Sequence, residues 1–348
     1  MEQHSFFMER CISLAKKGAG HVSPNPMVGC VIVHKGVVIG EGYHEKHGQA
    51  HAEVNAINSV QNKELLKEST LYVSLEPCAH FGLTPPCSDL IIKTGIPRVV
   101  IGAGDSNEKV AGKGIERLKM AGIEVTQGVL ESQCRELNKR FFTFQEKKRP
   151  FIILKWAETK DGFIDYPRTS REFGQPSWIT GEKALRKVHE MRAEEDAILV
   201  GTNTALKDNP SLTVRLCEGR NPLRIVIDNR LQLPASLNLF DRKTQTLVFN
   251  SLKNQPDGNP AYLKLDFEKE VVPQILSYLH SRNILSLIVE GGRKTLESFI
   301  MPGLWDEAYR FVGNKKFMNG TKAPEISGVI VHKEKFEADK LIIYRNLH

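Results

Sequence analysis

The segment SLEPCAHFGLTPPC, residues 74–87, contains two cysteines, Cys78 and Cys87, and a proline directly precedes each of them. An apolar, β-rich run leads into this segment, and a helical run, CSDLIIKTG, begins at its last residue. Proline at a helix start leaves backbone N–H groups free nearby, and such groups stabilise a thiolate. Taken alone, the two thiols are compatible with a disulfide, with two core residues or with two ligands of one metal ion.

The segment HAEVNAI, residues 51–57, supplies the residues that favour a metal site. His51 and the two thiolates would make three zinc ligands and leave a fourth position to water, as in catalytic zinc sites. Glu53 is not needed as a ligand, and it could carry a proton from that water to a leaving amine. A lone His-x-Glu is more often a surface turn, so the interpretation depends on the cysteines downstream. The pattern typical of zinc deaminases, His-x-Glu with Pro-Cys-x-x-Cys, is similar, although eight residues separate the thiols here.

Length and composition indicate a globular protein with two domains. Of the 348 residues 41% are hydrophobic and 26% charged, and no apolar run reaches the ~18 residues of a membrane span. No secretory signal is visible, so we expect a cytoplasmic protein whose six cysteines form no disulfide framework. The net charge of +7 is dispersed, which disfavours nucleic-acid binding and is compatible with anionic small molecules. The cysteines predicted to be buried structural thiols are Cys11, Cys30, Cys134 and Cys217.

Strands alternate with helices along the chain, which predicts the α/β class. Residues 1–147 begin with a helix and a hairpin at 28–44, continue with alternating strands and helices, and end in a helix near 130–144. This order predicts an α/β/α sandwich with parallel strands after the hairpin. The charged segment EKKRP marks a domain boundary near residue 148, and residues 148–348 are expected to form a second α/β domain.

The second domain lacks the Gly-x-Gly-x-x-Gly fingerprint of a standard dinucleotide fold. Its segment LIVEGGRKTLESF, residues 287–299, places two glycines between an apolar strand and a helix. Paired glycines let the backbone approach a phosphate, and the start of the helix presents unpaired N–H groups to it. A tight turn between strand and helix would explain Gly291 and Gly292 equally well.

The first domain resembles the deaminase half of the bifunctional riboflavin-biosynthesis deaminase/reductase family in the segments NPMVGCVIV, GYHEKHGQAHAEVNAI and LEPCAHFGLTPPC. In that family a longer loop, Pro-Cys-x-His-x-Gly-x-Thr-Pro-Pro-Cys, replaces the short one. The resemblance implies a cytidine-deaminase-like fold, with Glu53 as proton shuttle. The ligands it implies for one Zn²⁺ per chain are His51, Cys78 and Cys87. The residues it places along the pocket, for which a structural role is about equally compatible, are Asn25, His44 and His80.

The second domain resembles the reductase half of the same family in LKWAETKDG, SWITG, VHEMRAEEDAILVGTNTALKDNPSLTVR and IVEGGRKTLESF. The resemblance implies a dihydrofolate-reductase-like fold that binds NADPH. The residues implied to contact NADPH are Ala157, Trp178, Thr204, Asp208, Gly292, Arg293, Lys294, Thr295, Leu296, Glu297 and Ser298. The residues implied to contact the substrate are Arg192, Leu212, Arg215 and Glu290.

The chemistry of these residue types fits the implied roles, because two arginines can hold a sugar phosphate by forked hydrogen bonds. Without the resemblance, Trp178 is better explained as a core residue, Arg192 as a solvated helix residue and Asp208 as a turn residue. Pro176 stands where the family often has serine, which puts one substrate hydrogen bond in question. The long loop FIDYPRTSREFGQP, residues 163–176, is a candidate lid. The candidates for an acid in the reduction are Lys155 and Asp161.

The two resemblances together predict a bifunctional enzyme of riboflavin biosynthesis. The first domain would hydrolyse 2,5-diamino-6-(5-phosphoribosylamino)pyrimidin-4-one to 5-amino-6-(5-phosphoribosylamino)uracil, and the second would reduce the ribosyl group to a ribityl chain with NADPH. The expected partner is a small phosphorylated pyrimidine, with no nucleic acid and no membrane, and a homo-oligomer is expected. One alternative is a nucleic-acid base deaminase with an accessory domain, which the dispersed charge disfavours. Another is a catalytically silent zinc scaffold, in which Glu53 would have no purpose.

Overall fold

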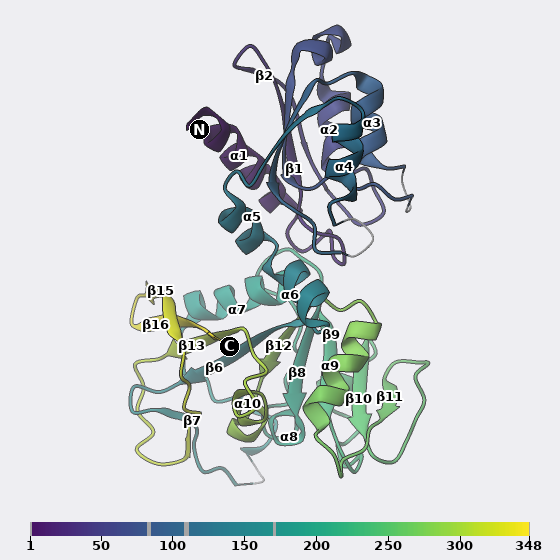
Figure 1. Ribbon diagram of the computed structural model, residues 1–348. Coiled ribbons are helices and arrows are strands. Elements are labelled where there is room, and N and C mark those ends of the chain that lie inside the picture. Colours follow the sequence, from purple (N-terminus) through teal and green to yellow (C-terminus); the bar gives the residue numbers. More distant parts are fainter. Residues whose placement is uncertain (1, 82–84, 108–110, 170–171, 348) are drawn as a thin grey trace. The chain divides into compact units, whose positions relative to one another are not determined.

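The computed structural model describes residues 2–81, 85–107, 111–169 and 172–347. The chain divides into two compact units, Met1–Lys148 and Arg149–His348 (Figure 1). Each unit is built around its own main sheet and its own hydrophobic core. Among the described residues, no helix is both long enough and apolar enough to cross a membrane.

Unit 1 contains a five-stranded sheet with the strand order β2-β1-β3-β4-β5. Its strands are β1 (Gly29–His34), β2 (Val37–Tyr43), β3 (Thr70–Leu75), β4 (Arg98–Ala103) and β5 (Glu124–Gln127). β1 and β2 form the predicted antiparallel hairpin, with Lys35 and Gly36 at positive φ in its turn. β1 also runs antiparallel to β3, whereas β4 and β5 continue from β3 in parallel. The prediction of parallel strands after an opening hairpin is therefore confirmed.

Helices cover both faces of this sheet, which gives the predicted α/β/α sandwich (Figure 1). They are α1 (Glu2–Ala15), α2 (Ala52–Ser59), α3 (Cys87–Thr94), α4 (Lys113–Met120), α5 (Glu131–Leu137) and α6 (Lys139–Lys147), with short 3-10 turns η1 (Lys16–Gly18) and η2 (Lys63–Glu68). α1 packs on β1 and β3, and α5 packs on β4 and α1. The apolar faces of α2, α3 and α4 cover the opposite side, where the core includes Ile32, Ile57, Leu71, Ile91 and Leu118.

The sequence predicts one helix near residues 130–144, but the structure divides it at Asn138 into α5 and α6. Asn138 has non-helical backbone angles (φ −107°, ψ 26°) and a buried side chain. Its amide oxygen accepts a hydrogen bond from the Met27 N–H at 2.8 Å, and its amide nitrogen donates one to the Met27 carbonyl at 2.9 Å. Asparagine readily bonds to backbone groups in place of a regular helix, and here it ties the loop before β1 to the end of the unit.

Unit 2 contains a nine-stranded sheet with the order β11-β10-β9-β8-β12-β6-β13-β16-β15. Its strands are β6 (Phe151–Glu158), β8 (Ala197–Gly201), β9 (Leu223–Ile227), β10 (Thr246–Asn250), β11 (Ala261–Lys264), β12 (Ser286–Glu290), β13 (Glu307–Val312), β15 (Val329–Phe336) and β16 (Asp339–Arg345). The helical elements are α7 (Glu182–Glu194), α8 (Thr202–Asp208), η4 (Asn238–Phe240), α9 (Val271–Ser281) and α10 (Arg293–Ile300). A separate small sheet pairs β7 (Phe163–Asp165) with β14 (Thr321–Lys322).

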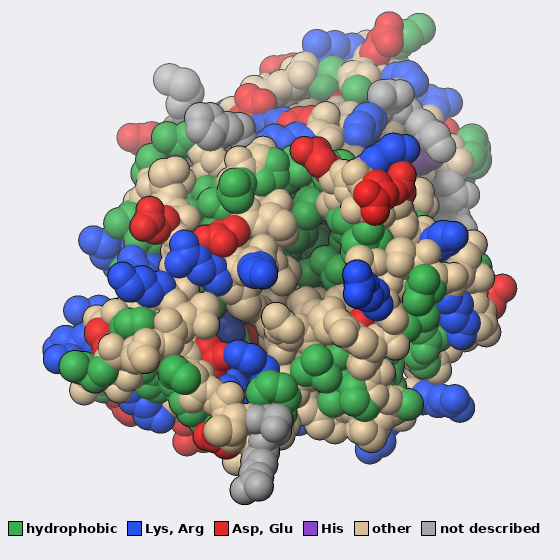
Figure 2. Space-filling view, turned by 90° about the horizontal axis from the view of Figure 1, so that it is seen from below, with side chains coloured by type: hydrophobic (Ala, Val, Ile, Leu, Met, Phe, Trp, Pro, Cys, Tyr) green, Lys and Arg blue, Asp and Glu red, His purple; other side chains and the backbone are tan. Residues whose placement is uncertain are grey.

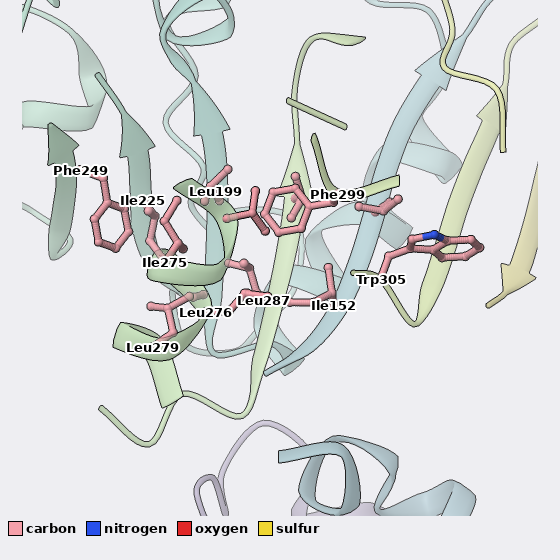
Figure 3. Packing of buried hydrophobic residues seen from close by; sticks show 14 of the residues in the cluster. Ile152, Leu199, Ile225, Phe249, Ile275, Leu276, Leu279, Leu287, Phe299 and Trp305 are labelled. Atoms are coloured by element: carbon pink, nitrogen blue, oxygen red, sulfur yellow. The ribbon is translucent and has the colours of Figure 1, made fainter. Parts of the chain in front are cut away.

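The strands from β11 to β13 run parallel and are covered on both faces, so most of their residues are apolar. On one face Ile152, Leu199 and Leu287 pack with Ile275 of α9 and Phe299 of α10 (Figure 3). Alternate side chains of the same strands point to the other face, where α7 and α8 cover them. Members of this second layer are Ile153, Ile198, Ile288, Val188 and Ala205.

A fully buried arginine lies within this sheet. Arg224 of β9 donates from Nε to Thr246 Oγ1 at 3.0 Å and from Nη2 to Asp241 Oδ1 at 2.8 Å. The remaining acceptors of its guanidinium are the carbonyls of Ser211, Asn238 and Thr244. A buried guanidinium is tolerated only when its donors are satisfied, so this side chain ties the loops around β9 and β10 together.

Beyond residue 300 the sequence pattern predicts no element, whereas the structure has strands β13 to β16 there. β15 and β16 form an antiparallel hairpin that extends the sheet beyond β13. In the described part of the chain no strand pairs with the outer edge of β15, where Val329, Ile330 and Val331 are exposed. An open apolar edge of this kind is a surface for pairing with another strand.

All six cysteines are free. Cys11, Cys30 and Cys134 are buried, as predicted. The prediction was wrong for Cys217, which is only partly buried because it lies in the surface loop after α8, next to the exposed Glu218.

Candidate active sites

Unit 1 brings together three potential metal ligands from segments far apart in the sequence. His51 Nδ1 lies 3.3 Å from Cys87 Sγ and 3.7 Å from Cys78 Sγ, and the three ligand atoms all lie within 4.8 Å of one another. Tetrahedral zinc with bonds of about 2.0–2.3 Å holds its ligand atoms roughly 3.5–3.8 Å apart. The cluster therefore has the size and the donor set that zinc requires.

Each of these ligands lies just after a strand or at the start of a helix. Cys78 follows β3, His51 is the N-cap of α2, and Cys87 is the first residue of α3. The Cys87 N–H, which is unpaired within α3, donates to Cys78 Sγ at 3.3 Å. The hydrogen bond from the Cys87 thiol, aided by those from His51 and this N–H, lowers the pKa of Cys78 to about 4. The same sharing raises the pKa of Cys87.

Glu53 lies beside this cluster in the first turn of α2 and is buried. Burial, together with negative charge on Cys78, raises the pKa of its carboxyl group to about 7. A carboxyl group that titrates near neutral pH can accept a proton and release it again within one turnover. Glu53 is therefore a buried carboxyl group next to the three potential ligands, in a position from which it could transfer a proton.

Two of the three other residues predicted for this pocket are bonded to each other next to His51. His44 Nδ1 lies 3.0 Å from the Ala50 carbonyl and must donate to it, which leaves Nε2 to accept from the Asn25 amide at 3.0 Å. Burial lowers the pKa of His44, and its ring meets the His51 ring edge-on with 5.2 Å between centroids. His80 is exposed on the loop between the two cysteines, where residues 82–84 lie outside the described residues.

Glu76, a residue outside the predicted site, organises the loops behind the ligand cluster. It precedes Cys78 by two positions and is only 4% exposed. Its carboxylate accepts four backbone N–H hydrogen bonds at 3.0–3.2 Å, from Asp105, Gly112, Gly114 and Ile115. The last two donors belong to the first turn of α4, whose positive end favours a carboxylate. A Cβ on Gly114 would lie 2.0 Å from the Pro77 carbonyl oxygen, so α4 begins directly against the turn that carries Cys78.

Unit 2 has a cavity of about 730 Å³ at the carboxyl ends of its parallel strands. Ligands of open parallel sheets bind at this edge. Figure 2 views the molecule from the end of unit 2 where Figure 1 shows α8 and β7, and it shows a hollow bordered by basic and hydrophobic side chains. The predicted residues that line the cavity are Ala157, Trp178, Thr204, Asp208, Glu290, Gly292, Arg293, Lys294, Thr295 and Ser298.

The turn between β12 and α10 requires a glycine at Gly291 and uses the backbone N–H of Gly292. Gly291 has a φ of 133°, a region that only glycine adopts readily, and a Cβ there would lie 2.9 Å from Thr204 Oγ1. Gly292 is the N-cap of α10 and donates its N–H to Thr204 Oγ1 at 2.8 Å. A tight turn packed against α8 is thus sufficient to explain Gly291. The turn also opens the N-terminus of α10 onto the cavity, through Arg293 and Lys294.

Two residues of the predicted cofactor segment point away from the cavity. Leu296 is fully buried in the core between the sheet and α10. Glu297 forms an ion pair with Arg293 at 2.6 Å. Consecutive helix residues point in different directions, so a continuous range cannot all face one cavity.

Arg192 and Glu290 form a buried ion pair next to the cavity. Arg192 Nη2 lies 3.1 Å from both carboxylate oxygens of Glu290, and Lys155 Nζ lies 3.7 Å from one of them. Burial alone would raise the pKa of Glu290, but the two cations lower it overall. Burial also lowers the pKa of Lys155. Arg192 is therefore not a solvated residue, and Trp178, at 53% exposure beside the cavity, is not a core residue.

The other two predicted substrate residues lie in the loop after α8. Leu212 is buried, with a positive φ of 54°. Arg215 is exposed, and its backbone N–H donates to His189 Nδ1 at 3.0 Å. Burial and the positive charge of Arg192 both lower the pKa of Arg215, so two guanidinium groups lie close enough to repel each other.

A charged network that sequence reasoning missed ties the candidate lid, residues 163–176, to α8. Arg168, whose side chain is 2% exposed, lies 2.8 Å from Asp165 and 2.8 Å from Asp208. Lys207 Nζ also lies 2.9 Å from Asp165. Nothing in the local sequence marks these pairs, because charged residues are common in surface loops; residues 170 and 171 of the lid lie outside the described residues.

The two candidates for an acid occupy different surroundings. Lys155 lines the cavity. Asp161 instead accepts hydrogen bonds from Thr159 Oγ1 at 2.6 Å and from the Phe317 and Met318 N–H groups at 3.2 and 2.8 Å, which fixes a turn. Pro176, at the position where the family often has serine, lines the cavity together with Ser177.

Two family models match the chain in succession. The model described as "Cytidine and deoxycytidylate deaminase zinc-binding region" matches residues 1–103, and the model described as "RibD C-terminal domain" matches residues 150–320. The predicted fold, a cytidine-deaminase-like sandwich followed by a reductase domain of the dihydrofolate-reductase-like type, is confirmed. Fold and sites together define a deaminase joined to a reductase.

The chain belongs to the family of the riboflavin biosynthesis protein RibD and is a bifunctional enzyme of riboflavin biosynthesis. It is 41% identical to RibD of Aquifex aeolicus (strain VF5) over 97% of each chain, and 40% identical to RibD of Bacillus amyloliquefaciens over 92% of this chain and 87% of that one. A solved structure from Thermotoga maritima, a diaminohydroxyphosphoribosylaminopyrimidine deaminase/5-amino-6-(5-phosphoribosylamino)uracil reductase, is 40% identical with a TM-score of 0.89 over 99% of both chains. Acinetobacter baumannii RibD (form 1) is 30% identical with a TM-score of 0.90, over 100% of this chain and 99% of that one. The predicted bifunctional enzyme is confirmed in preference to a nucleic-acid base deaminase.

Replacing Glu76 by glutamine should release the start of α4. The amide keeps the size of the side chain but loses its charge, and its NH₂ group faces backbone N–H groups that need an acceptor. We expect amide hydrogen exchange at Gly114 and Ile115 to accelerate by about tenfold or more in the full chain. Glu116→Gln, an exposed position on the same helix, is the matched control. Unchanged exchange at Gly114 in the Glu76 variant would contradict the role given to this carboxylate.

Proposed function

We propose that unit 1 deaminates 2,5-diamino-6-(5-phosphoribosylamino)pyrimidin-4-one to 5-amino-6-(5-phosphoribosylamino)uracil with one zinc ion held by His51, Cys78 and Cys87. The observation that carries this proposal is the compact group of one imidazole and two thiols beside the buried carboxyl group of Glu53. Three protein ligands leave one coordination position open, whereas a structural zinc has four. The name of the Thermotoga maritima relative, a deaminase of a diaminohydroxyphosphoribosylaminopyrimidine, supports the choice of substrate.

Bound zinc supplies a Lewis acid that makes water a nucleophile at neutral pH. Glu53 accepts the proton of the attacking water and delivers it to the leaving 2-amino group. Burial is the largest influence on the pKa of its carboxyl group and disfavours a permanent charge, which suits a group that accepts a proton and then releases it. We assign Asn25 and His44, which hold each other beside His51, to orienting the pyrimidine, and His80 to the rim of the pocket.

Unit 2 is proposed to reduce the ribosyl group to a ribityl chain with NADPH bound in the cavity of about 730 Å³. NADPH supplies the hydride. The N-terminus of α10, with the cations of Arg293 and Lys294, favours the phosphates of the cofactor, and the exposed ring of Trp178 offers it a flat apolar surface. The further residues assigned to the cofactor are Ala157, Thr204, Asp208, Gly292, Thr295 and Ser298. Leu296 and Glu297 can contribute only through their backbone, since their side chains point elsewhere.

The phosphoribosyl part of the substrate is assigned to Arg192, Leu212, Arg215 and Glu290. Two guanidinium groups that lie close together are stabilised when an anion binds both, and a sugar phosphate is such an anion. Glu290 can accept hydrogen bonds from sugar hydroxyls while Arg192 and Lys155 hold its charge. Lys155 is the better candidate for the acid, because burial lowers its pKa and it lines the cavity, whereas Asp161 fixes a turn.

We further propose that the enzyme works in the cytoplasm and as a homo-oligomer. Its six free cysteines suit a reducing compartment, in which thiolates stay available to a metal. The open edge of β15, with the exposed Val329, Ile330 and Val331, supports self-association. The substrate proposed for both units is a small phosphorylated pyrimidine, and neither a nucleic acid nor a membrane is proposed as a partner.

Zinc content tests the ligand assignment. We expect about one zinc per chain in the purified protein and a near-complete loss in Cys87→Ser, because two remaining ligands hold zinc weakly. Cys134→Ser, a buried cysteine outside the cluster, should retain the metal. Equal zinc content in the two variants, measured by elemental analysis, would rule out Cys87 as a ligand.

Glu53→Gln tests the proton shuttle. Glutamine keeps the size and polarity of the side chain but cannot carry the proton, so ammonia release should fall about 10²–10⁴-fold with zinc retained. NADPH oxidation with 5-amino-6-(5-phosphoribosylamino)uracil should not change, because Glu53 lies in the other unit. Near-normal ammonia release from a zinc-replete Gln variant would exclude the assigned role.

Arg192→Ala tests the substrate end of unit 2. Loss of a charge-assisted contact to phosphate should raise the KM for the pyrimidine phosphate about tenfold or more and leave the NADPH KM within about twofold. Ammonia release should stay normal. Arg186→Ala, an exposed arginine on the same helix, is the control. A rise in the NADPH KM with an unchanged substrate KM would assign Arg192 to the cofactor instead.

A further inference from the structure

His189 is a fully buried histidine to which the proposed reaction gives no role. It lies on α7, one turn before Arg192, and its exposure is 0%. Its Nδ1 accepts the backbone N–H of Arg215 at 3.0 Å, across 26 positions of sequence. A single imidazole therefore contacts both segments that carry the proposed phosphate-binding arginines.

The hydrogen bond to Arg215 fixes the state of the ring. Because Nδ1 accepts, it carries no proton, and the proton of the neutral imidazole is on Nε2. Burial, followed by the positive charges of Arg192 and Arg215, lowers the pKa of His189 to about 4. The ring stays neutral at physiological pH, so it remains an acceptor for the Arg215 N–H.

The Arg215 segment depends on such an anchor. Asn209 and Leu212 both have positive φ (41° and 54°), so the chain turns sharply on its way from α8 to Arg215. The Arg215 side chain itself is exposed, and among the described residues the one hydrogen bond found for its guanidinium is that from Nη1 to Thr213 Oγ1, at 2.9 Å within the same segment. The position of the Arg215 backbone sets where its side chain begins, and that backbone is bonded to His189.

The charges around His189 point to an anionic ligand. Arg192 has Glu290 as partner, but no ion pair to Arg215 is found among the described residues, although the two guanidiniums repel each other. His189 Nε2 and Arg192 Nε, one turn apart on α7, are also buried donors without a partner in the part of the chain that the structure describes. Unmatched donors and like charges gathered in one place are expected where an acceptor with negative charge binds.

We propose that His189 is a positioning residue of the reductase: its Nδ1 fixes the backbone at Arg215 so that Arg215 and Arg192 act on one phosphate of the substrate. This inference rests on the proposed assignment of both arginines to the phosphoribosyl group. Its competitor is direct contact, in which the Nε2–H of His189 itself donates to the substrate. The two roles use opposite sides of the ring.

These two roles can be distinguished in the full-length enzyme by replacements that each keep the hydrogen-bonding group of one side of the ring. Asparagine can place its amide oxygen near the position of Nδ1, glutamine can place its amide nitrogen near that of Nε2, and leucine keeps neither. We expect His189→Leu and His189→Gln to raise the KM for 5-amino-6-(5-phosphoribosylamino)uracil about tenfold, and His189→Asn to stay within about threefold of the parent. The NADPH KM should not change in any of these variants. A general loss of structure would instead raise the KM for both the substrate and NADPH.

Ammonia release by unit 1, measured in the same samples, reports whether each variant chain is intact. Met191→Leu, a buried, volume-conserving change on the same helix, is the matched control and should leave both KM values unchanged. Rescue by glutamine and not by asparagine would overturn the positioning role in favour of direct contact. An unchanged substrate KM in His189→Leu would overturn it as well.

Arg215→Ala in the same assay tests the inference about His189 separately from the proposed assignment of Arg215 to the substrate phosphate. If Arg215→Ala raises the substrate KM and His189→Leu does not, the inference about His189 fails alone. If neither change raises it, the assignment of Arg215 to the phosphate fails, and the role of His189 fails with it.

Discussion

In a parallel sheet whose strands are buried on both faces, polar functional groups have access to solvent and ligands only at the ends of the strands. Both units obey this constraint. In unit 1, β3 ends before the turn that carries Cys78, and α2 and α3 begin beside that turn with His51 and Cys87. In unit 2, β6, β8 and β12 end at the cavity, where α8 and α10 begin. In each unit strand ends and helix starts meet at one edge, so the cysteines of unit 1 and the cavity of unit 2 both lie beside N–H groups that are unpaired within their helix.

Three carboxyl groups, two of them buried and one partly buried, show how surroundings give one functional group different roles. Glu76 accepts four backbone N–H hydrogen bonds and serves as a rigid support for α4. Glu290 is held between Arg192 and Lys155, which lower its pKa despite burial. No ion pair to Glu53 is found among the described residues, and burial raises its pKa to about 7. Of the three carboxyl groups, the one without a compensating cation or a set of backbone donors is the one whose pKa lies near neutrality.

Local sequence predicted that His51, Cys78 and Cys87 come together, and it predicted the two α/β folds, because both depend on short-range sequence patterns. His51, Cys78 and Cys87 lie at boundaries between elements, and the spacing of prolines and thiols around them is unusual. The contacts of Glu76 and His189 could not be predicted in the same way, since their partners follow tens of residues later and are backbone groups that any residue provides. The resemblance implied that all residues from Gly292 to Ser298 contact the cofactor, but the side chains of Leu296 and Glu297 point away from the cavity. A continuous range cannot show which face of a helix is buried. The break at Asn138 was missed for a related reason: its side chain is bonded to Met27, a contact across 111 positions that the local pattern does not show.

Asn138 also sets a lower limit on the length of a chain that could keep the deaminase alone. Its side-chain amide clamps Met27, in the loop that leads from Asn25 into β1, across 111 positions of sequence. A gene cut at residue 103, where the match to the zinc-binding region ends, would still encode every ligand of the cluster. It would nevertheless free the Asn25 loop and uncover the side of the sheet on which α5 packs. If this gene is divided into two, in evolution or in the laboratory, the piece that encodes the deaminase therefore has to extend at least through Asn138.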